Sequence, residues 1–217
     1  MGVAPAGAST LGGTATIANP SNNTALPSGG STTTFTVNLP AGAACDGDTA
    51  TGGYHVYSFL VQAGTDITSA TFNNFPSQGY GFVDNTGTYY GPANTAINTG
   101  QIISIPTNFQ WGPLVVSDGG ALALSDLLYS GTSGDWDAGL VCANSSGHVA
   151  DYWTTPVLFT ASNSDPNGFT WTSGPRSSTP EAPVALMLPV IGAAAAVFVL
   201  MRKRRQRHPE VAAVDAA

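Results

Sequence analysis

Residues 54–61 read Tyr-His-Val-Tyr-Ser-Phe-Leu-Val, a run that is apolar on both faces of an extended chain. A short apolar run that follows a turn signal, here Thr-Gly-Gly at residues 51–53, is typical of a strand buried on both sides. We therefore predict that residues 54–61 form the central strand of a β-rich domain.

Shorter windows on either side of this run alternate between apolar and polar residues, as half-buried strands do. The predicted apolar faces are Ala15 with Ile17; Phe35, Val37 and Leu39; Trp136, Ala138, Leu140 and Cys142; Val157, Phe159 and Ala161; and Phe169 with Trp171. Residues 101–105 and 114–117 are further candidate strands, and residues 121–129 are the one candidate for a short helical turn. Turn signals rich in Gly, Asn, Asp and Pro separate these windows at residues 40–42, 84–87, 144–147 and 165–168. Many short strands with regular turns predict a β-sandwich.

The segment from Trp136 to Cys142, a turn at 144–147 and the segment 153–160 resemble the last strands of bacterial immunoglobulin-like domains. Asp137, Gly139 and Cys142 are similar to the Asp-x-Gly-x-Tyr-x-Cys run of immunoglobulin strand F, one residue shorter and with Leu140 where the family has Tyr. The resemblance implies an all-β fold, an immunoglobulin-like antiparallel β-sandwich, over residues 11–172.

The charge distribution excludes several functions. Residues 1–180 contain one basic residue, Arg176, and ten Asp but no Glu, a net charge of about −9. Nucleic-acid binding requires cations that displace phosphate counterions, so we expect no nucleic-acid partner. The absence of Lys from this stretch excludes a P-loop, a Schiff base and a lysine–asparagine crosslink.

The two cysteines, Cys45 and Cys142, are an even pair. In an exported chain such a pair most simply forms one disulfide. The alternative is two buried free thiols.

The C-terminal region predicts a membrane anchor. Residues 184–201 are eighteen residues without a charge, which as a helix rise roughly 27 Å, close to the ~30 Å hydrocarbon core. Arg202, Lys203, Arg204 and Arg205 follow at once, so the positive-inside rule places residues 202–217 in the cytoplasm and the domain outside. We expect a transmembrane helix over 184–201, preceded by a Pro/Ser/Thr linker over 173–183. A buried core helix is the alternative.

Within that linker, Pro180, Glu181 and Pro183 precede the apolar run and the basic block. This arrangement resembles the tripartite sorting signals of bacterial surface proteins, of the Pro-Glu-Pro class handled by exosortases or the Leu-Pro-x-Thr-Gly class handled by sortases. Ala182 interrupts the first pattern, so a permanent anchor remains an equal alternative to processing. Residues 1–10 are either a flexible N-terminus or the remnant of a signal peptide, with Ala6-Gly7-Ala8 matching an A-x-A cleavage site.

The sequence shows no catalytic constellation. Asp46 with Asp48 and Asp135 with Asp137 are the closest carboxylate pairs, which we interpret as turn and surface residues. Asp46-Gly47-Asp48 lacks the frame of a calcium loop, and the two histidines of the domain, His55 and His148, lack zinc-ligand spacing. We predict no catalytic residues, no metal and no cofactor, and interpret both histidines as structural residues with satisfied hydrogen bonds.

Residues 79–91 are rich in aromatics beside Asn and Asp. If exposed, Tyr80, Tyr89, Tyr90 and Trp111 would stack on sugar rings; the alternative is a hairpin whose aromatics belong to the core. The leading hypothesis is a non-enzymatic surface or envelope protein at the cell membrane, whose partners are the membrane and a surface protein or glycan. A carbohydrate- or ligand-binding module is the second hypothesis, and an Asp-dependent hydrolase is the third.

Overall fold

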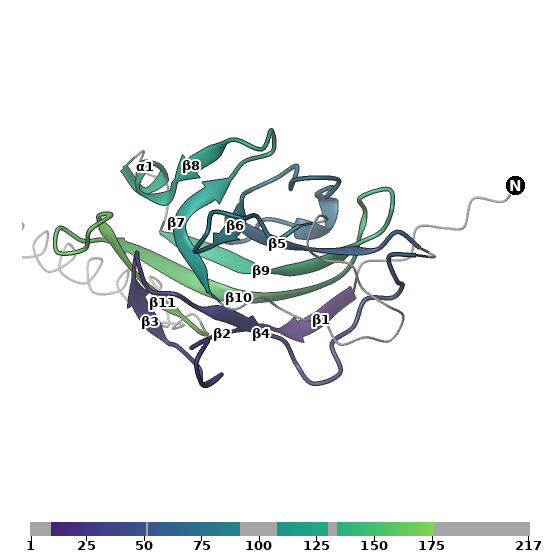
Figure 1. Cartoon of the computed structure of the whole chain (residues 1–217), viewed down its shortest axis with the longest axis horizontal. Coiled ribbons are helices and arrows are strands. Elements are labelled where there is room, and N and C mark those ends of the chain that lie inside the picture. The colour runs from purple at the N-terminus through teal and green to yellow at the C-terminus, as the bar shows by residue number, and fades with distance from the viewer. Residues whose placement is uncertain (1–9, 51, 92–107, 130–133, 176–217) are drawn as a thin grey trace, which may run out of the picture. The chain divides into compact units, whose positions relative to one another are not determined.

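The computed structural model in Figure 1 describes residues 10–50, 52–91, 108–129 and 134–175. The strands are β1 (Thr10–Thr14), β2 (Thr16–Ala18), β3 (Ser28–Gly30), β4 (Thr36–Asn38), β5 (His55–Gln62), β6 (Gly81–Asp84), β7 (Phe109–Val115), β8 (Ala121–Ala123), β9 (Asp135–Ala143), β10 (Val149–Ala161) and β11 (Phe169–Ser173). Two short helices, η1 (Ile67–Ser69) and α1 (Leu124–Tyr129), complete the described elements. The all-β class is therefore confirmed, and α1 confirms the short helical turn expected within residues 121–129.

The largest sheet has six strands, ordered β3-β11-β10-β9-β5, with β1 as an additional neighbour of β10. The pairs along this path are antiparallel, whereas β1 runs parallel to β10. Residues 56–61 of β5 are all buried, which confirms that both faces of this strand are covered. In the order of hydrogen-bonded strands, however, β9 and β10 lie in the middle of the sheet and β5 lies at one end of the order. The prediction that residues 54–61 form the central strand is therefore wrong in this respect. Both faces of β5 are buried because side chains pack above and below it.

A glycine in the middle of β9 explains how the three longest strands pack so closely. Gly139 lies opposite Thr154 of β10 and Phe59 of β5. A Cβ atom at Gly139 would collide with the carbonyl oxygen of Trp153 and would lie 2.9 Å from the Phe59 ring. Glycine normally weakens a strand interior, and here it permits a backbone approach that no other residue allows.

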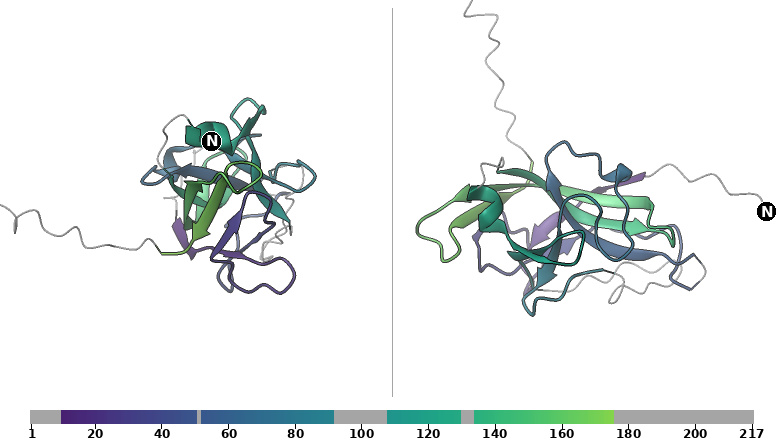
Figure 2. Two further views of the ribbon diagram at one scale, coloured as in Figure 1. Left: turned by 90° about the vertical axis from the view of Figure 1, so that its left-hand side faces the viewer. Right: turned by 90° about the horizontal axis from the view of Figure 1, so that it is seen from above.

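The two smaller sheets are β2–β4 and β6–β7–β8 (Figure 2). Their apolar side chains join those of the largest sheet in one buried cluster, so residues distant in sequence share one core. Members from the small sheets and the segments beside them are Ala15, Ile17, Phe35, Val37, Phe82, Phe109, Trp111 and Leu114; members from the largest sheet are Val56, Leu60, Trp136, Ala138, Leu140, Cys142, Trp153, Val157, Phe159, Phe169 and Trp171.

The predicted apolar faces are buried in most of these strands, with three differences. In β9, residues 138–143 are buried on both faces and do not alternate. Ala161, expected to be buried with Val157 and Phe159, is exposed because it lies where β10 runs out into the following turn. Thr36, expected on the polar face of its strand, is buried. A second, smaller cluster, which includes Tyr57, Phe59 and Val141, covers the opposite face of β5 and β9.

The turn signals predicted the loops well. At residues 84–87, 144–147 and 165–168 the last residue is a Gly with positive φ, and its N–H donates to the carbonyl of the first residue. In each turn the first residue, Asp84, Asn144 or Asp165, also accepts backbone N–H groups through its side chain. This is the turn chemistry expected of Asx residues followed by glycine.

Several expected segments lie wholly or partly outside the described residues, namely 1–10, 101–105, the transmembrane segment 184–201 and the tail 202–217. Ser173, expected to begin the linker over 173–183, belongs to β11 and pairs with Val157. Residues 176–183 of that expected linker, with Pro180, Glu181 and Pro183, lie outside the described residues. No helix in the described part of the chain is long and apolar enough to cross a membrane.

Candidate functional site

The best-positioned aromatic of the segment 79–91 is Tyr80, which precedes β6. Its backbone forms a two-bond bridge with β5, since Tyr80 N donates to Leu60 O (2.9 Å) and Leu60 N donates to Tyr80 O (2.7 Å). The ring is half-buried and lies 5.9 Å, centroid to centroid, from the ring of Trp136 on β9. Tyr80 is thus anchored at its backbone and packed against Trp136, while the residue remains partly exposed.

Tyr80 lines a hollow of about 280 Å³. Its lining combines the Tyr80 ring with polar side chains from the β5 end and the following turn: Val61, Gln62, Thr65, Gln78, Gly79, Tyr80 and Trp136. We call it the Tyr80 hollow. The two amide side chains, of Gln62 and Gln78, are exposed, and Thr65 is half-buried. The lining residues carry no charge.

Gly79 lines the Tyr80 hollow, and its replacement is expected to destabilise the domain. Its φ is +73°, and a Cβ atom there would lie 2.5 Å from both the Leu60 carbonyl oxygen and Val61 Cγ1. Gly64, in the turn that follows β5, has φ +84° but open space around its missing Cβ. Both substitutions to Ala incur the left-handed penalty of about 1–2 kcal/mol. Gly79→Ala should cost about 1–3 kcal/mol more, because it also overpacks the site.

Urea unfolding of Gly79→Ala and Gly64→Ala measures this difference directly. Equal losses in the two variants would contradict the close approach at Gly79.

Of the other three aromatics proposed for ligand stacking, Tyr90 and Trp111 are enclosed by the protein and Tyr89 is half-buried. Tyr90 and Trp111 are 3% and 0% exposed, so the expectation that they present a face to a sugar is not met. Tyr89 lies with its ring between Gly81 and Gly91, 5.5 Å from the Phe75 ring, and its hydroxyl donates to Ser58 O (3.3 Å). Burial raises the pKa of Tyr89 and of Tyr90, which keeps both phenols neutral. Residues 79–91 therefore largely follow the alternative interpretation, a hairpin with core aromatics.

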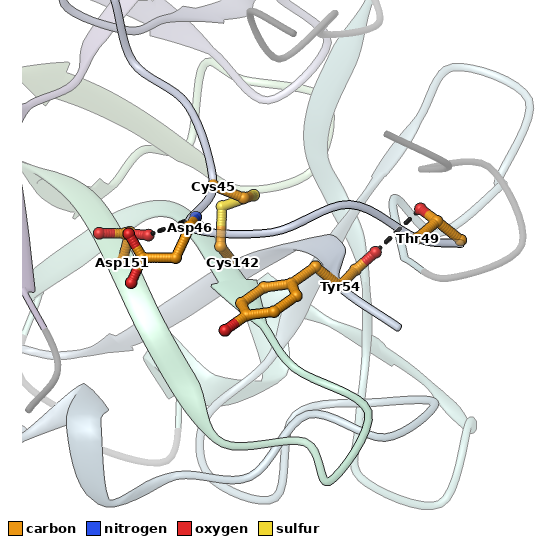
Figure 3. The surroundings of a disulfide bond; sticks show 6 residues. All are labelled: Cys45, Asp46, Thr49, Tyr54, Cys142 and Asp151. Atoms are coloured by element: carbon orange, nitrogen blue, oxygen red, sulfur yellow. Dashed lines mark hydrogen bonds between the residues drawn. A yellow bond between two sulfur atoms is a disulfide. The ribbon is translucent and has the colours of Figure 1, made fainter. Parts of the chain in front are cut away.

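The predicted disulfide between Cys45 and Cys142 is confirmed, with 5.5 Å between the Cα atoms (Figure 3). It joins the loop before β5 to β9. Next to it, Asp46 N donates to Asp151 Oδ2 (3.2 Å), and the Asp46 carboxylate acts electrostatically on the Asp151 carboxyl. Asp151 is buried, and burial together with the negative charge of Asp46 raises the pKa of its carboxyl.

This pair makes stability depend on pH in a defined direction. Because folding raises the pKa of Asp151, the folded state holds the proton more tightly than the unfolded state does. The stabilisation is complete below the ordinary pKa of 3.8 and is lost as the pH rises through the higher folded value. Asp46→Asn removes the repulsion, so it should lower the pKa of Asp151 and reduce this loss.

NMR titration of the Asp151 carboxyl and unfolding between pH 3 and pH 7 test the effect. Asp126→Asn is the control, since Asp126 is exposed on α1. An unchanged Asp151 titration in Asp46→Asn would refute the coupling.

The other acidic residues and histidines considered as catalytic or metal-binding candidates do not gather at one site in the described structure. Asp135 and Asp137 are half-buried on β9, and Asp48 accepts backbone N–H groups of the following loop through its carbonyl. His55 was expected to have satisfied hydrogen bonds, but its Nδ1 atom is buried without a partner in the described structure, which is a correction. Within the described ranges, no group of three or more His, Cys, Asp or Glu side chains is arranged to hold a metal ion.

Sequence reasoning missed three residues of the Tyr80 hollow and one partner of the acidic pair. Gln62, Thr65 and Gln78 carry no motif, and only the pairing of Tyr80 with Leu60 brings Gln78 to the end of β5. Asp151 lies 105 residues from Asp46 in the chain. The one usable signal was the cysteine pair, because a bond between Cys45 and Cys142 places Asp46 next to β9 and its neighbour β10.

The fold and these contacts define a disulfide-bonded, all-β domain. No family model matches the chain, and no match is found among curated proteins or solved structures.

Proposed function

We propose that this protein is an exported, non-enzymatic cell-surface or envelope protein that presents its β-domain outside the membrane for structural or adhesive contacts. The observation that carries the proposal is the disulfide between Cys45 and Cys142. Disulfides form and persist in oxidising compartments and are rare in the cytosol. The absence of Lys and Arg from residues 1–175 agrees with a domain that does not bind nucleic acid.

The attachment proposed for this domain rests on the sequence of residues 173–217. The uncharged run 184–201 followed by Arg202, Lys203, Arg204 and Arg205 supports a C-terminal anchor with a cytoplasmic tail. Pro180, Glu181 and Pro183 support a sorting signal that an exosortase or sortase would process. A permanent transmembrane helix explains the same residues without cleavage.

For the fold, we propose the immunoglobulin-like sandwich in place of the coarser all-β description. It is supported by the buried cluster, to which β2, β4, β6 and β7 contribute on one side and β5, β9, β10 and β11 on the other. A crystal structure in which the small sheets do not face the largest sheet would remove this proposal.

Cell fractionation with intact-mass spectrometry of the purified protein tests the proposed function. We expect the protein in the membrane or surface fraction, with a mass two hydrogens below that of the reduced chain. A C-terminus near residues 179–183 would identify a processed signal, and an intact C-terminus a permanent anchor. Recovery of the chain in the cytosol with both cysteines reduced would overturn the proposal.

A further inference from the structure

We propose that the Tyr80 hollow binds one pyranose ring of a neutral sugar. This inference deepens the proposed function, because it names a ligand class for the adhesive contact at the cell surface. Binding by the purified domain does not depend on where the protein resides, so the two proposals fail separately.

The first argument is that the aromatic wall is held in place before any ligand arrives. The Tyr80 backbone is bonded twice to Leu60, and Gly79 lies so close to β5 that only glycine fits there. The Tyr80 ring also packs at 5.9 Å, centroid to centroid, against the buried ring of Trp136. The opposite side is a tight turn, in which Thr65 N donates to Gln62 O (3.0 Å) and Ala63 N donates to Asp135 O (3.1 Å). A fixed wall reduces the ordering cost of binding.

The second argument is the chemistry of the lining. A pyranose presents a face of C–H groups, which suits the electron-rich face of an aromatic ring, and a rim of hydroxyl groups that donate and accept hydrogen bonds. Amide side chains both donate and accept, so Gln62 and Gln78 can each bond neighbouring hydroxyls. Gln78 Nε2 already donates to Ser69 Oγ (3.2 Å), which orients its amide group and leaves its carbonyl oxygen for a ligand.

The third argument concerns size and charge. A hollow of about 280 Å³ lies just below the ~300–1,000 Å³ range of drug-sized ligand sites, so it suits one small ring. Residues 1–175 carry ten Asp, so the domain as a whole is negatively charged. With no Lys or Arg in residues 1–175, nothing in the domain offsets a negative ligand. Uronic acids, sialic acids and sugar phosphates are therefore disfavoured, and neutral hexoses are favoured.

Another hollow of about 360 Å³, beside β8 and α1, lacks this combination. Its lining is mainly aliphatic, and the side-chain amide of its Asn167 donates to Ser31 Oγ (3.0 Å). Its one aromatic lining residue, Phe169, is only 1% exposed, and no pair of exposed amides lines it.

The test is an NMR titration of the ¹⁵N-labelled domain with the methyl glycosides of glucose, galactose, mannose and N-acetylglucosamine, and with glucuronate. We expect at least one neutral glycoside to shift the amide signals of residues 62–65 and 78–80. Glucuronate should bind with an affinity at least about tenfold lower, a difference in binding free energy of ~1.4 kcal/mol.

Variants decide whether the shifts report on this hollow. Gln62→Ala with Gln78→Ala removes the exposed amides without touching the core, and should weaken binding at least about tenfold. Tyr80→Phe should bind like the wild type, and Tyr80→Ala should not bind. Tyr152→Ala is the control, since Tyr152 is another half-buried tyrosine but lies on β10, outside the hollow. No shifts with any neutral glycoside, undiminished shifts in the double variant, or equal binding of glucuronate would each overturn the proposal.

Discussion

Removing the disulfide between Cys45 and Cys142 is expected to lower the free energy of unfolding by about 4–5 kcal/mol. The two residues are 97 positions apart, and a crosslink across so long a loop restricts the unfolded chain strongly. Single domains are stable by only about 5–15 kcal/mol, so the loss is a large fraction of the total. Urea unfolding of Cys45→Ala and Cys142→Ala, against the oxidised wild type, measures it.

The two single variants separate the crosslink from the packing of the sulfur atoms. Both lose the same covalent bond, but Cys142 is fully buried in the main core, whereas Cys45 is only partly buried at its edge. Cys142→Ala should therefore be the less stable of the two by up to about 1 kcal/mol. Adding a reductant should destabilise the wild type by a similar amount to Cys45→Ala and leave both variants unchanged. A wild type insensitive to reductant would argue against the bond as the source of stability.

Alternation in the sequence predicted the strands because side chains on a half-buried strand must alternate between core and water. It located the apolar faces of β9 and β11, and the unbroken run at 54–61 predicted the buried β5 within one residue at each end. The turns were predictable for a different reason. A turn that begins with Asp or Asn and ends with a Gly at positive φ is determined by those residues themselves, so it can be inferred without knowing which distant residues it contacts.

The same local logic could not separate surface aromatics from core aromatics. The residues around Tyr89 and Tyr90 form a polar, Gly-rich segment of sequence, yet Tyr90 is buried against Phe109 and Tyr89 packs, half-buried, against Phe75. Tyr80 is positioned by a long-range backbone bridge to Leu60, which the neighbouring sequence does not reveal. The partner of Asp46 was hidden for the same reason, since β10 comes next to Asp46 through tertiary pairing and not through any sequence spacing.

Trp111→Ala is expected to destabilise the domain by about 3–5 kcal/mol. Trp111 is fully buried on β7 and contacts four other aromatic rings. Its ring centroid lies 4.3 Å from that of Phe35, 5.3 Å from Phe82, 5.4 Å from Phe159 and 6.3 Å from Trp171. Truncation removes this packing between the small sheets and the largest sheet, and the surrounding rings are too constrained to fill the space. Leu158→Ala, at a position 46% exposed, should cost less than about 1 kcal/mol.

Conservative substitutions at two buried tryptophans should then behave differently. In the described structure the Nε1 atom of Trp111 is buried without a hydrogen-bond partner, whereas Trp171 Nε1 donates to Gly30 O (3.0 Å). Trp111→Phe loses apolar contact but also removes an unsatisfied donor, so these effects partly cancel. Trp171→Phe loses contact and a hydrogen bond, so it should be less stable than Trp111→Phe by about 1 kcal/mol. Urea midpoints of the two variants test this order, and a Trp111→Phe variant as unstable as Trp111→Ala would show that the indole nitrogen is satisfied in solution.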